Sequence, residues 1–371
     1  MPDLGVRLQL MIGSNVPLPA PYAVLEALLD LEVTNKDRER DGFQMKFSLG
    51  KDTPLDYGLL NRGILNPPNR VVISVVFGVM PQVLIDGVIT DQQVTPSNKP
   101  GESTLTITGE DISVMLDLEE KNATFPNQTD SAIVTRVIAG YARFGLIPKV
   151  TPTTDVPIQT ERIPTQQGTD LAFIQQLAQR NGFVFYIEPG PLPGVNMATW
   201  GLDNRLGLPQ PALTMNMGAN TNVDSSINFR LNALGPAEPQ VTIVEPFTRL
   251  AIPIPLPSGL RPPLATRPAT ALRRTLARDT ANRNPAQAAL RGLSSASQSS
   301  DAVSATGEVD AVRYGRALRS RRLVGVRGVG MSYGGLYYVK EVTHRIKRGE
   351  YKQSFSLTRE GLGASTPAVV P

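Results

Sequence analysis

The chain has 371 residues, of which 41% are apolar and 19% charged, and it contains no cysteine. The lack of cysteine excludes disulfides, thiolate metal sites and cysteine nucleophiles. The formal charge of +4 is modest for this length. The sequence contains no run of about eighteen apolar residues, so no transmembrane helix is predicted. Its 32 glycines and 32 prolines favour a protein of short strands and many turns.

The N-terminal residues, MPDLGVRLQLMIG, do not have the charged-then-apolar layout of a secretory signal peptide. We therefore expect the chain to be made and assembled in the cytoplasm.

The first 120 residues are predicted to form a small β-barrel or sandwich. Phe43, Met45, Phe47 and Leu49 alternate with polar residues, as in a half-buried strand. No long helix is predicted between the strands of this part. The predicted strands are Val6–Met11, Phe43–Leu49, Arg70–Met80, Val83–Thr90 and Ser103–Gly109.

Residues 121–235 mix helix with strand and could complete the first barrel. A helical period predicts a helix over Ser131–Leu146, ended by Pro148. A second helix should begin at Thr169–Asp170 and end before Gly182, which suits a left-handed C-terminal cap. The strand Phe183–Ile187 follows it directly. The fold class is therefore mainly β with an α+β middle segment.

Proline, serine, alanine and arginine dominate from about Pro253 to Thr306, where no strand-like run is apparent. Residues 256–306 are interpreted as a long loop or insertion, partly without fixed structure. A short helix is expected at Val309–Arg319. After it the strand pattern returns.

The most regular pattern is a β-hairpin near the C-terminus. Leu336–Lys347 and Tyr351–Thr358 are two strands separated by Arg348-Gly349-Glu350. Gly349 supplies the positive φ that a short hairpin loop needs.

Three segments, in this order, resemble the baseplate-hub family of contractile injection machines. They are Thr104–Glu119, Thr169–Glu188 and LVGVRGVGMSYGGLYYVKEVTHRIKRGEYKQSFSLTREGLG, residues 323–363. The family includes phage late control protein D, the phage T4 hub protein and the N-terminal part of VgrG spikes. The segments carry no catalytic signature, so the resemblance depends on their joint order.

The resemblance implies a homotrimer in which two small β-barrels per subunit form a ring. That ring would adapt a threefold spike to the sixfold tail tube. It implies a structural, non-enzymatic protein without cofactors, metal ions or a small-molecule substrate. The implied partners are a separate spike protein, the tail tube or its initiator, and baseplate wedge proteins.

In this arrangement residues 236–255 together with 320–363 would form the second barrel, and residues 364–371 a tail. Only ASTPAVVP follows Gly363, so the spike tip is expected to be another chain. The particle would be a phage tail or a phage-tail-like injection machine.

The residues give little support to catalysis. His344 is the only histidine; it alternates with Val342 and Ile346 and is interpreted as a side chain of a barrel wall. Carboxylates at Asp37/Glu39, Asp117/Glu119/Glu120 and Glu308/Asp310 would fit a hydrolase only if one were buried, and their positions instead suggest solvation and capping. Gly325, Gly328 and Gly330 lack the context of a nucleotide loop and are interpreted as bulges or bends.

The basic segment between residues 256 and 330 admits two interpretations. It has thirteen arginines against four carboxylates. One interpretation is nucleic-acid binding, although the first half has no aromatic residues for base stacking. The other is an arm that docks on acidic neighbouring subunits. The candidate docking residues are Arg273, Arg274, Arg278, Arg319, Arg321 and Arg322.

Overall fold

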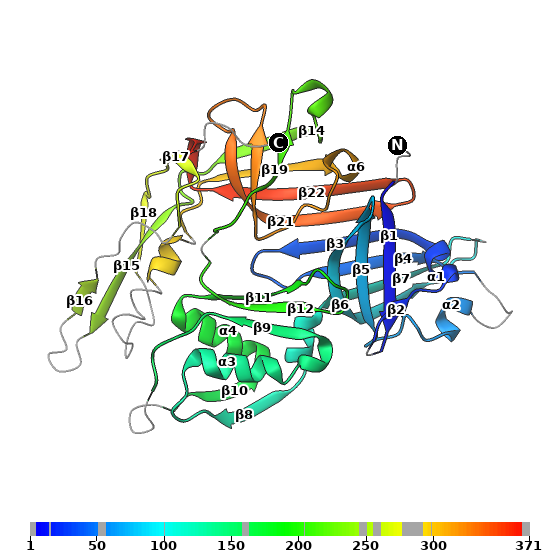
Figure 1. Cartoon of the computed structure of the whole chain (residues 1–371), viewed down its shortest axis with the longest axis horizontal. Helices are drawn as coiled ribbons and strands as arrows, with labels where there is room; N and C mark the ends of the chain where they lie inside the picture. Colours follow the sequence, from blue (N-terminus) through cyan, green and yellow to red (C-terminus); the bar gives the residue numbers. More distant parts are fainter. Residues whose placement is uncertain are drawn as a thin grey trace.

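A computed structural model describes residues 5–365, except positions 15, 51–56, 100, 158–162, 204, 245–250, 255–260, 277–291 and 298. Within these residues the chain is mainly β with an α+β middle segment, as the sequence predicts (Figure 1). No helix in this part of the chain is long and apolar enough to cross a membrane.

Thirteen strands form the largest sheet. The strands of its N-terminal half are β1 Arg7–Gly13, β2 Leu18–Pro19, β3 Leu28–Lys36, β4 Gly42–Ser48, β5 Arg70–Phe77, β6 Met80–Thr95 and β7 Thr104–Asp111. Those of its C-terminal half are β13 Gln210–Thr214, β14 Val223–Leu231, β19 Val303–Asp310, β20 Leu323–Arg327, β21 Gly335–Lys347 and β22 Glu350–Arg359. The order is β14-β19-β22-β21-β3-β4-β7-β6-β5-β1-β2, with β20 beside β21 and β13 beside β20.

The N-terminal half folds around its own apolar core. Alternation in β4 points Phe43, Met45 and Phe47 inward, where each is at most 3% exposed. The apolar run of β5 is buried on both faces. Two short helices, α1 Tyr22–Ala27 and α2 Gly58–Asn61, add partly buried side chains to this core.

The C-terminal half is built on the predicted hairpin. β21 and β22 pair in an antiparallel ladder from Tyr338↔Thr358 to Lys347↔Glu350. Gly349 lies in the turn between them with a φ of 78°. Gly328 and Gly330, with φ of 78° and 84°, turn the chain after β20, in agreement with two of the three predicted bends. For Gly325 the prediction is wrong, because it lies in β20 and pairs regularly with Leu336 of β21.

The two halves join where β21 pairs with β3, from Glu341↔Lys36 to Lys347↔Asp30. We expected two separate barrels, but the described strands form one open sheet and close no barrel. The reason is that β3 and β21 satisfy each other's backbone groups, so each half gives up one edge to the other.

The middle segment follows the N-terminal half. Its elements are η1 Ile112–Leu116, β8 Glu120–Thr124, α3 Asp130–Ala139, η2 Ala142–Phe144, β9 Leu146–Val150, β10 Thr165–Thr169, α4 Asp170–Asn181, β11 Val184–Pro189 and β12 Asn196–Gly201. The helices lie between the β8–β10 pair and the sheet β11-β12-β9 (Figure 1). They enclose a separate core around Trp200, which is fully buried.

One predicted helix boundary in this segment is wrong. The helix predicted over Ser131–Leu146 ends at Ala139, and Pro148 lies inside β9. Gly145 ends the short η2 turn with a φ of 71°, and a Cβ there would lie 1.9 Å from the Gly194 carbonyl oxygen. Glycine at this position therefore lets the chain turn into β9 against that backbone.

Two strands, β17 Ala265–Pro268 and β18 Arg273–Leu276, lie within residues 256–306, where the sequence predicted a loop. β17 pairs with β23 Gly361–Ala364, and β18 pairs with β15 Ala237–Val244, which also pairs with β16 Ala251–Ile254. Residues 292–297 are helical, and η3 is Gly218–Asn220. Residues 236–255, which the sequence assigned to the second barrel, thus contribute β15 and β16 to a small sheet with β18, and neither strand pairs with β20, β21 or β22.

The helix expected at Val309–Arg319 is only the single turn α6 Ala311–Tyr314. Asp310 caps it through the N–H groups of Val312 and Arg313, and Gly315 ends it with a φ of 76°. Val309 instead lies in β19, which begins at Val303 inside the predicted insertion and ends at Asp310. The predicted division of the chain into segments stays a prediction.

Candidate functional site

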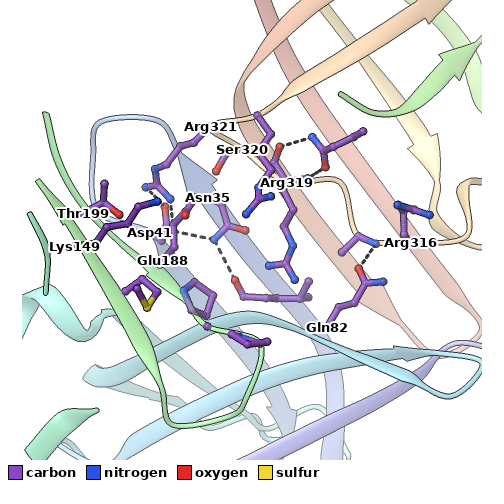
Figure 2. Close-up of a pocket in the computed structure, with 18 residues that line it drawn as sticks. Asn35, Asp41, Gln82, Lys149, Glu188, Thr199, Arg316, Arg319, Ser320 and Arg321 are labelled. Carbon is purple, nitrogen blue, oxygen red and sulfur yellow. Dashed lines mark hydrogen bonds and ion pairs between the residues drawn. The ribbon is translucent and has the colours of Figure 1, made fainter. Parts of the chain in front are cut away.

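Three parts of the chain meet around the residues that lead into β20. We call this region the arginine junction and define it as Arg316–Arg322 with Asp41, Tyr186 and Glu188. Asp41 comes from the turn between β3 and β4, and Tyr186 and Glu188 come from β11 of the middle segment. Figure 2 shows the side chains of Asp41, Glu188 and Arg321 converging from different elements.

Arg321 forms the central contact of the junction. Its guanidinium nitrogens lie 3.0 and 3.2 Å from the two carboxylate oxygens of Asp41. The guanidinium also lies over the ring of Tyr186, 4.7 Å from the centroid. The side chains of Arg321 and Asp41 are 4% and 2% exposed. Because either charge would be costly to bury alone, the pair holds the three parts together.

Arg321 reaches this position from an unusual backbone conformation. Its φ is 62°, in the left-handed region that costs a non-glycine residue about 1 kcal/mol. The ion pair with Asp41 and the hydrogen bond to the Asp37 carbonyl oxygen offset this cost. Nothing in the sequence pattern around Arg321 indicates the conformation.

Asp41 is positioned by neighbours from its own half of the sheet. It accepts hydrogen bonds from Asn35 Nδ2 at 3.0 Å and from the Lys36 amide at 2.8 Å. Its own amide donates to Asp111 at 2.7 Å. Burial, together with the nearby Asp41 carboxylate, raises the pKa of Asp111 to about 6. The junction therefore rests on a network of buried carboxylates.

A second buried ion pair joins the N-terminal half to the middle segment. Arg70 in β5 and Asp86 in β6 make two hydrogen bonds of 2.7 Å, and their side chains are 5% and 0% exposed. Asp86 also accepts from Asn196 Nδ2 at 3.0 Å, and Arg70 donates to the carbonyl oxygens of Phe144 and Gly194. These three partners come from residues around β9 and β12.

Arginine pairs also fasten the segment between β12 and β13. Arg205 makes hydrogen bonds of 2.8 and 2.6 Å to Asp301 and lies over the ring of Tyr338, 4.2 Å from its centroid. Arg261 pairs with Asp203. Part of the charge of the basic segment is therefore neutralised within the chain.

Beside the arginine junction lies a cavity of about 520 Å³, which we call the junction cavity. Figure 2 shows Lys149 and Glu188 on one side of it, Gln82 and Arg316 on the other, and Arg319 between them. Arg319 donates to the Val83 carbonyl oxygen, and burial lowers the pKa of its guanidinium. Apolar lining comes from Leu84, Pro189, Pro191, Met197 and Ala317.

The six candidate docking arginines do not form one surface. Arg319 and Arg321 make contacts inside the protein, whereas Arg322 is exposed at the junction cavity. Arg273 and Arg274 are exposed on β18, where Arg274 lies 3.6 Å from the exposed Glu238. Arg278 lies outside the described residues. A docking role for the exposed arginines stays a prediction.

His344 lies inside the sheet, on the face that its alternation with Val342 predicts. It is fully buried, and its Nδ1 is 2.8 Å from the hydroxyl of Tyr351. Burial, with Arg319 nearby, lowers the pKa of His344 to about 3. The imidazole is therefore neutral near pH 7 and out of reach of solvent, which does not suit a general base.

The carboxylates considered for a hydrolase mostly serve structure. Asp310 caps α6, Glu308 pairs with Lys352, and Asp117 pairs with Arg40. For Asp37 the prediction of a solvated carboxylate is wrong. This residue is only 9% exposed, and burial raises the pKa of its carboxyl group.

The residues that the sequence did not single out are Arg70, Asp86, Asp41 and Asp111. Asp86 did carry a signal, because it interrupts the apolar run Val83–Ile89, where a carboxylate must be buried with a partner. Arg70, at the start of another apolar run, carried the same signal. Asp41 and Asp111 lie at strand ends, and only the packing of distant segments buries them.

Solved structures with this fold include phage tail proteins, a component of a type VI secretion system and a Francisella PdpA–VgrG complex. The predicted resemblance to the baseplate-hub family is confirmed at the level of the fold. At 10 to 15% sequence identity, the likeness is one of architecture.

The tail protein of Neisseria meningitidis superposes with a TM-score of 0.64 at 13% identity, over 97% of this chain and 98% of that chain. The 43 kDa tail protein of prophage MuSo2 from Shewanella oneidensis gives 0.60 at 15% identity, over 96% and 99%. A type VI secretion component of E. coli gives 0.55 at 13% identity, over 93% and 77%.

Sequence comparisons add little. The family profile described as the Alg8 N-terminal domain matches residues 44–201, less than half of the chain. No curated protein matches.

Proposed function

We propose that the chain is a structural baseplate hub of a phage tail or phage-tail-like contractile injection particle, assembled in the cytoplasm. The observation that carries the proposal is the length of the fold match. The likeness to the Neisseria tail protein extends over 97% of this chain and 98% of the other. Such a likeness concerns the arrangement of all segments rather than one widespread domain.

The two halves of the large sheet support the proposed ring. Each half has its own apolar core, and the β3–β21 ladder holds the halves side by side. Three subunits would then present six β-units around a threefold axis, which suits an adaptor between a threefold spike and a sixfold tube. The proposed partners are a separate spike protein, the tail tube or its initiator, and wedge proteins.

The test is the mass and shape of the purified full-length protein. Multi-angle light scattering should give three times the mass of one chain, and negative-stain electron microscopy should show threefold rings. A particle that stays monomeric over the whole accessible concentration range, also with its spike protein present, would contradict the hub.

The alternative of nucleic-acid binding through residues 256–330 stays a prediction. Arg319 donates to a backbone carbonyl oxygen of this chain, and Arg321 and Arg261 form ion pairs with Asp41 and Asp203. The described arginines of this segment are therefore not arranged as one exposed basic stripe, and no observation favours this alternative.

A further inference from the structure

Four cations line the junction cavity without a carboxylate partner. Lys149, Arg316, Arg319 and Arg322 have no Asp or Glu within ion-pair distance in the part of the chain that the structure describes. Asp41 also lines the cavity, but it is already engaged by Arg321. An excess of unpaired positive charge in a concave site raises the local concentration of anions.

Of the four cations, Arg319 gives the strongest indication that the cavity binds an anion. Among the described residues, its guanidinium donates one hydrogen bond, to the Val83 carbonyl oxygen, which uses one of five N–H donors. Burial lowers the pKa of its guanidinium, and the nearby carboxylates of Glu188 and Asp41 offset this only in part. An anionic group in the cavity would supply both further negative charge and acceptors for the remaining donors.

Glu188 is the only carboxylate on the described cavity lining besides Asp41, and no ion pair engages it within the described residues. It lies on the same side of the cavity as Lys149 (Figure 2). A bound anion would be repelled by Glu188 and attracted by the four cations. Removing the charge of Glu188 should therefore strengthen anion binding, whereas removing the charge of a cation should weaken it. A purely structural role would not produce these opposite effects.

The lining also indicates which kind of anion fits. Leu84, Pro189, Pro191, Met197 and Ala317 give the cavity apolar walls, and no aromatic ring lies among its lining residues on which a base could stack. A volume of about 520 Å³ suits a ligand of a few amino-acid residues. Acidic side chains with short aliphatic stems match both the charge and the walls.

We propose that the junction cavity is a docking site for a short acidic peptide segment of a partner protein. The peptide carboxylates would contact Lys149, Arg319 and Arg322, and its aliphatic parts would pack on Pro189 and Met197. The identity of the partner as a protein of the particle rests on the proposed function. The binding itself does not depend on ring formation, so the two proposals can fail separately.

The test measures binding of fluorescein-labelled hexaglutamate to the full chain by fluorescence anisotropy at low salt. Hexaglutamate should bind saturably, more weakly as salt rises, whereas hexaglutamine and hexalysine should not bind. The double variant Lys149→Gln with Arg322→Gln should weaken binding about tenfold. Both side chains are exposed and without an ion-pair partner in the described chain, so their loss should leave the fold intact.

The matched control removes the same charges elsewhere. Lys46→Gln with Arg230→Gln changes two exposed residues of β4 and β14 outside the cavity and should bind as the unaltered chain does. Glu188→Gln should tighten binding about threefold, whereas Glu120→Gln on β8 should not.

Three results would overturn the proposal. The first is the absence of saturable binding at low salt. The second is equal weakening in the cavity variant and in the control, which would indicate only the overall charge. The third is tighter, cavity-dependent binding of a six-nucleotide oligo(dT), which would assign the cavity to nucleic acid instead.

Discussion

Buried ionisable side chains divide into two kinds in this protein. Arg321, Asp41, Arg70 and Asp86 are paired, so each charge keeps a partner when it leaves water. His344 has no charge partner, and its Nε2 is buried without a hydrogen-bond partner among the described residues. The paired groups hold segments together, while the histidine is held neutral.

The substitution His344→Gln should change how stability depends on pH. The pKa of His344 is about 3 in the folded chain and near 6.5 in the unfolded chain, so below pH 6.5 protons bind preferentially to the unfolded state. The contribution of the neutral imidazole is present above pH 6.5 and is lost as pH falls towards 3, by about 1.4 kcal/mol per pH unit. Glutamine does not titrate, so the variant should lose less stability over this range.

Urea unfolding at pH 7, 5.5 and 4.5 measures this difference. Asp111 acts in the opposite direction, because its raised pKa of about 6 favours folding below pH 3.8 and loses that contribution as pH rises through 6. It is present in both proteins, so the difference between them isolates His344. Parallel stability curves would show that His344 does not titrate as expected.

The two helices of the middle segment, α3 and α4, are each followed by a glycine, but the two glycines differ in backbone conformation. α4 begins at the Thr169 cap and ends at Gly182, whose φ is 67°. α3 ends at Gly140, whose φ of −60° any residue can adopt. Both glycines follow a helix, but only Gly182 requires the left-handed conformation.

The substitution Gly182→Ala should lower the free energy of unfolding by about 1 kcal/mol, because a Cβ disfavours positive φ. Gly140→Ala is the matched control and should leave stability unchanged or slightly raised, since alanine is the better helix former. Chemical denaturation of both variants measures the difference. Equal losses would mean that the change from glycine to alanine matters for another reason.

At the scale of the whole molecule, buried contacts join the three parts into one unit. The β3–β21 ladder connects the two sheet halves, and Arg70–Asp86 ties the N-terminal half to the middle segment. The arginine junction adds contacts among all three parts. We therefore expect cooperative unfolding, although the three largest apolar clusters of the described residues are distinct.

Trp200, the only tryptophan, reports on the middle segment, whereas far-UV circular dichroism reports mainly on the sheet. In urea the two signals should give the same midpoint for the unaltered chain. Arg70→Met leaves Asp86 buried without its cation, so it should destabilise the protein by about 3 kcal/mol and separate the two midpoints. Arg345→Met, which breaks an exposed pair with Glu32, should keep them together. Separate midpoints in the unaltered chain would refute a single cooperative unit.

Local patterns were sufficient for several elements. Alternation predicted β4 and the β21–β22 hairpin, and the Thr169 and Gly182 signals predicted both ends of α4, because these features depend on neighbours in sequence. Local patterns failed where the chain folds against distant residues. α3 is shorter than its periodicity suggests, and β15 to β18 lie partly in a stretch with no strand-like composition.

The candidate site shows the same division more sharply. The sequence identified a basic segment and named Arg319, Arg321 and Arg322. It did not distinguish Arg321, which is ion-paired, from Arg322, which has no ion pair among the described residues. That distinction depends on Asp41, which lies 280 residues away in the sequence, and on strands of the middle segment that form the cavity wall. Residue types and their order were enough for the mainly β fold and its family resemblance. The joining of the halves and the charges left unpaired depend on long-range packing, which no local pattern encodes.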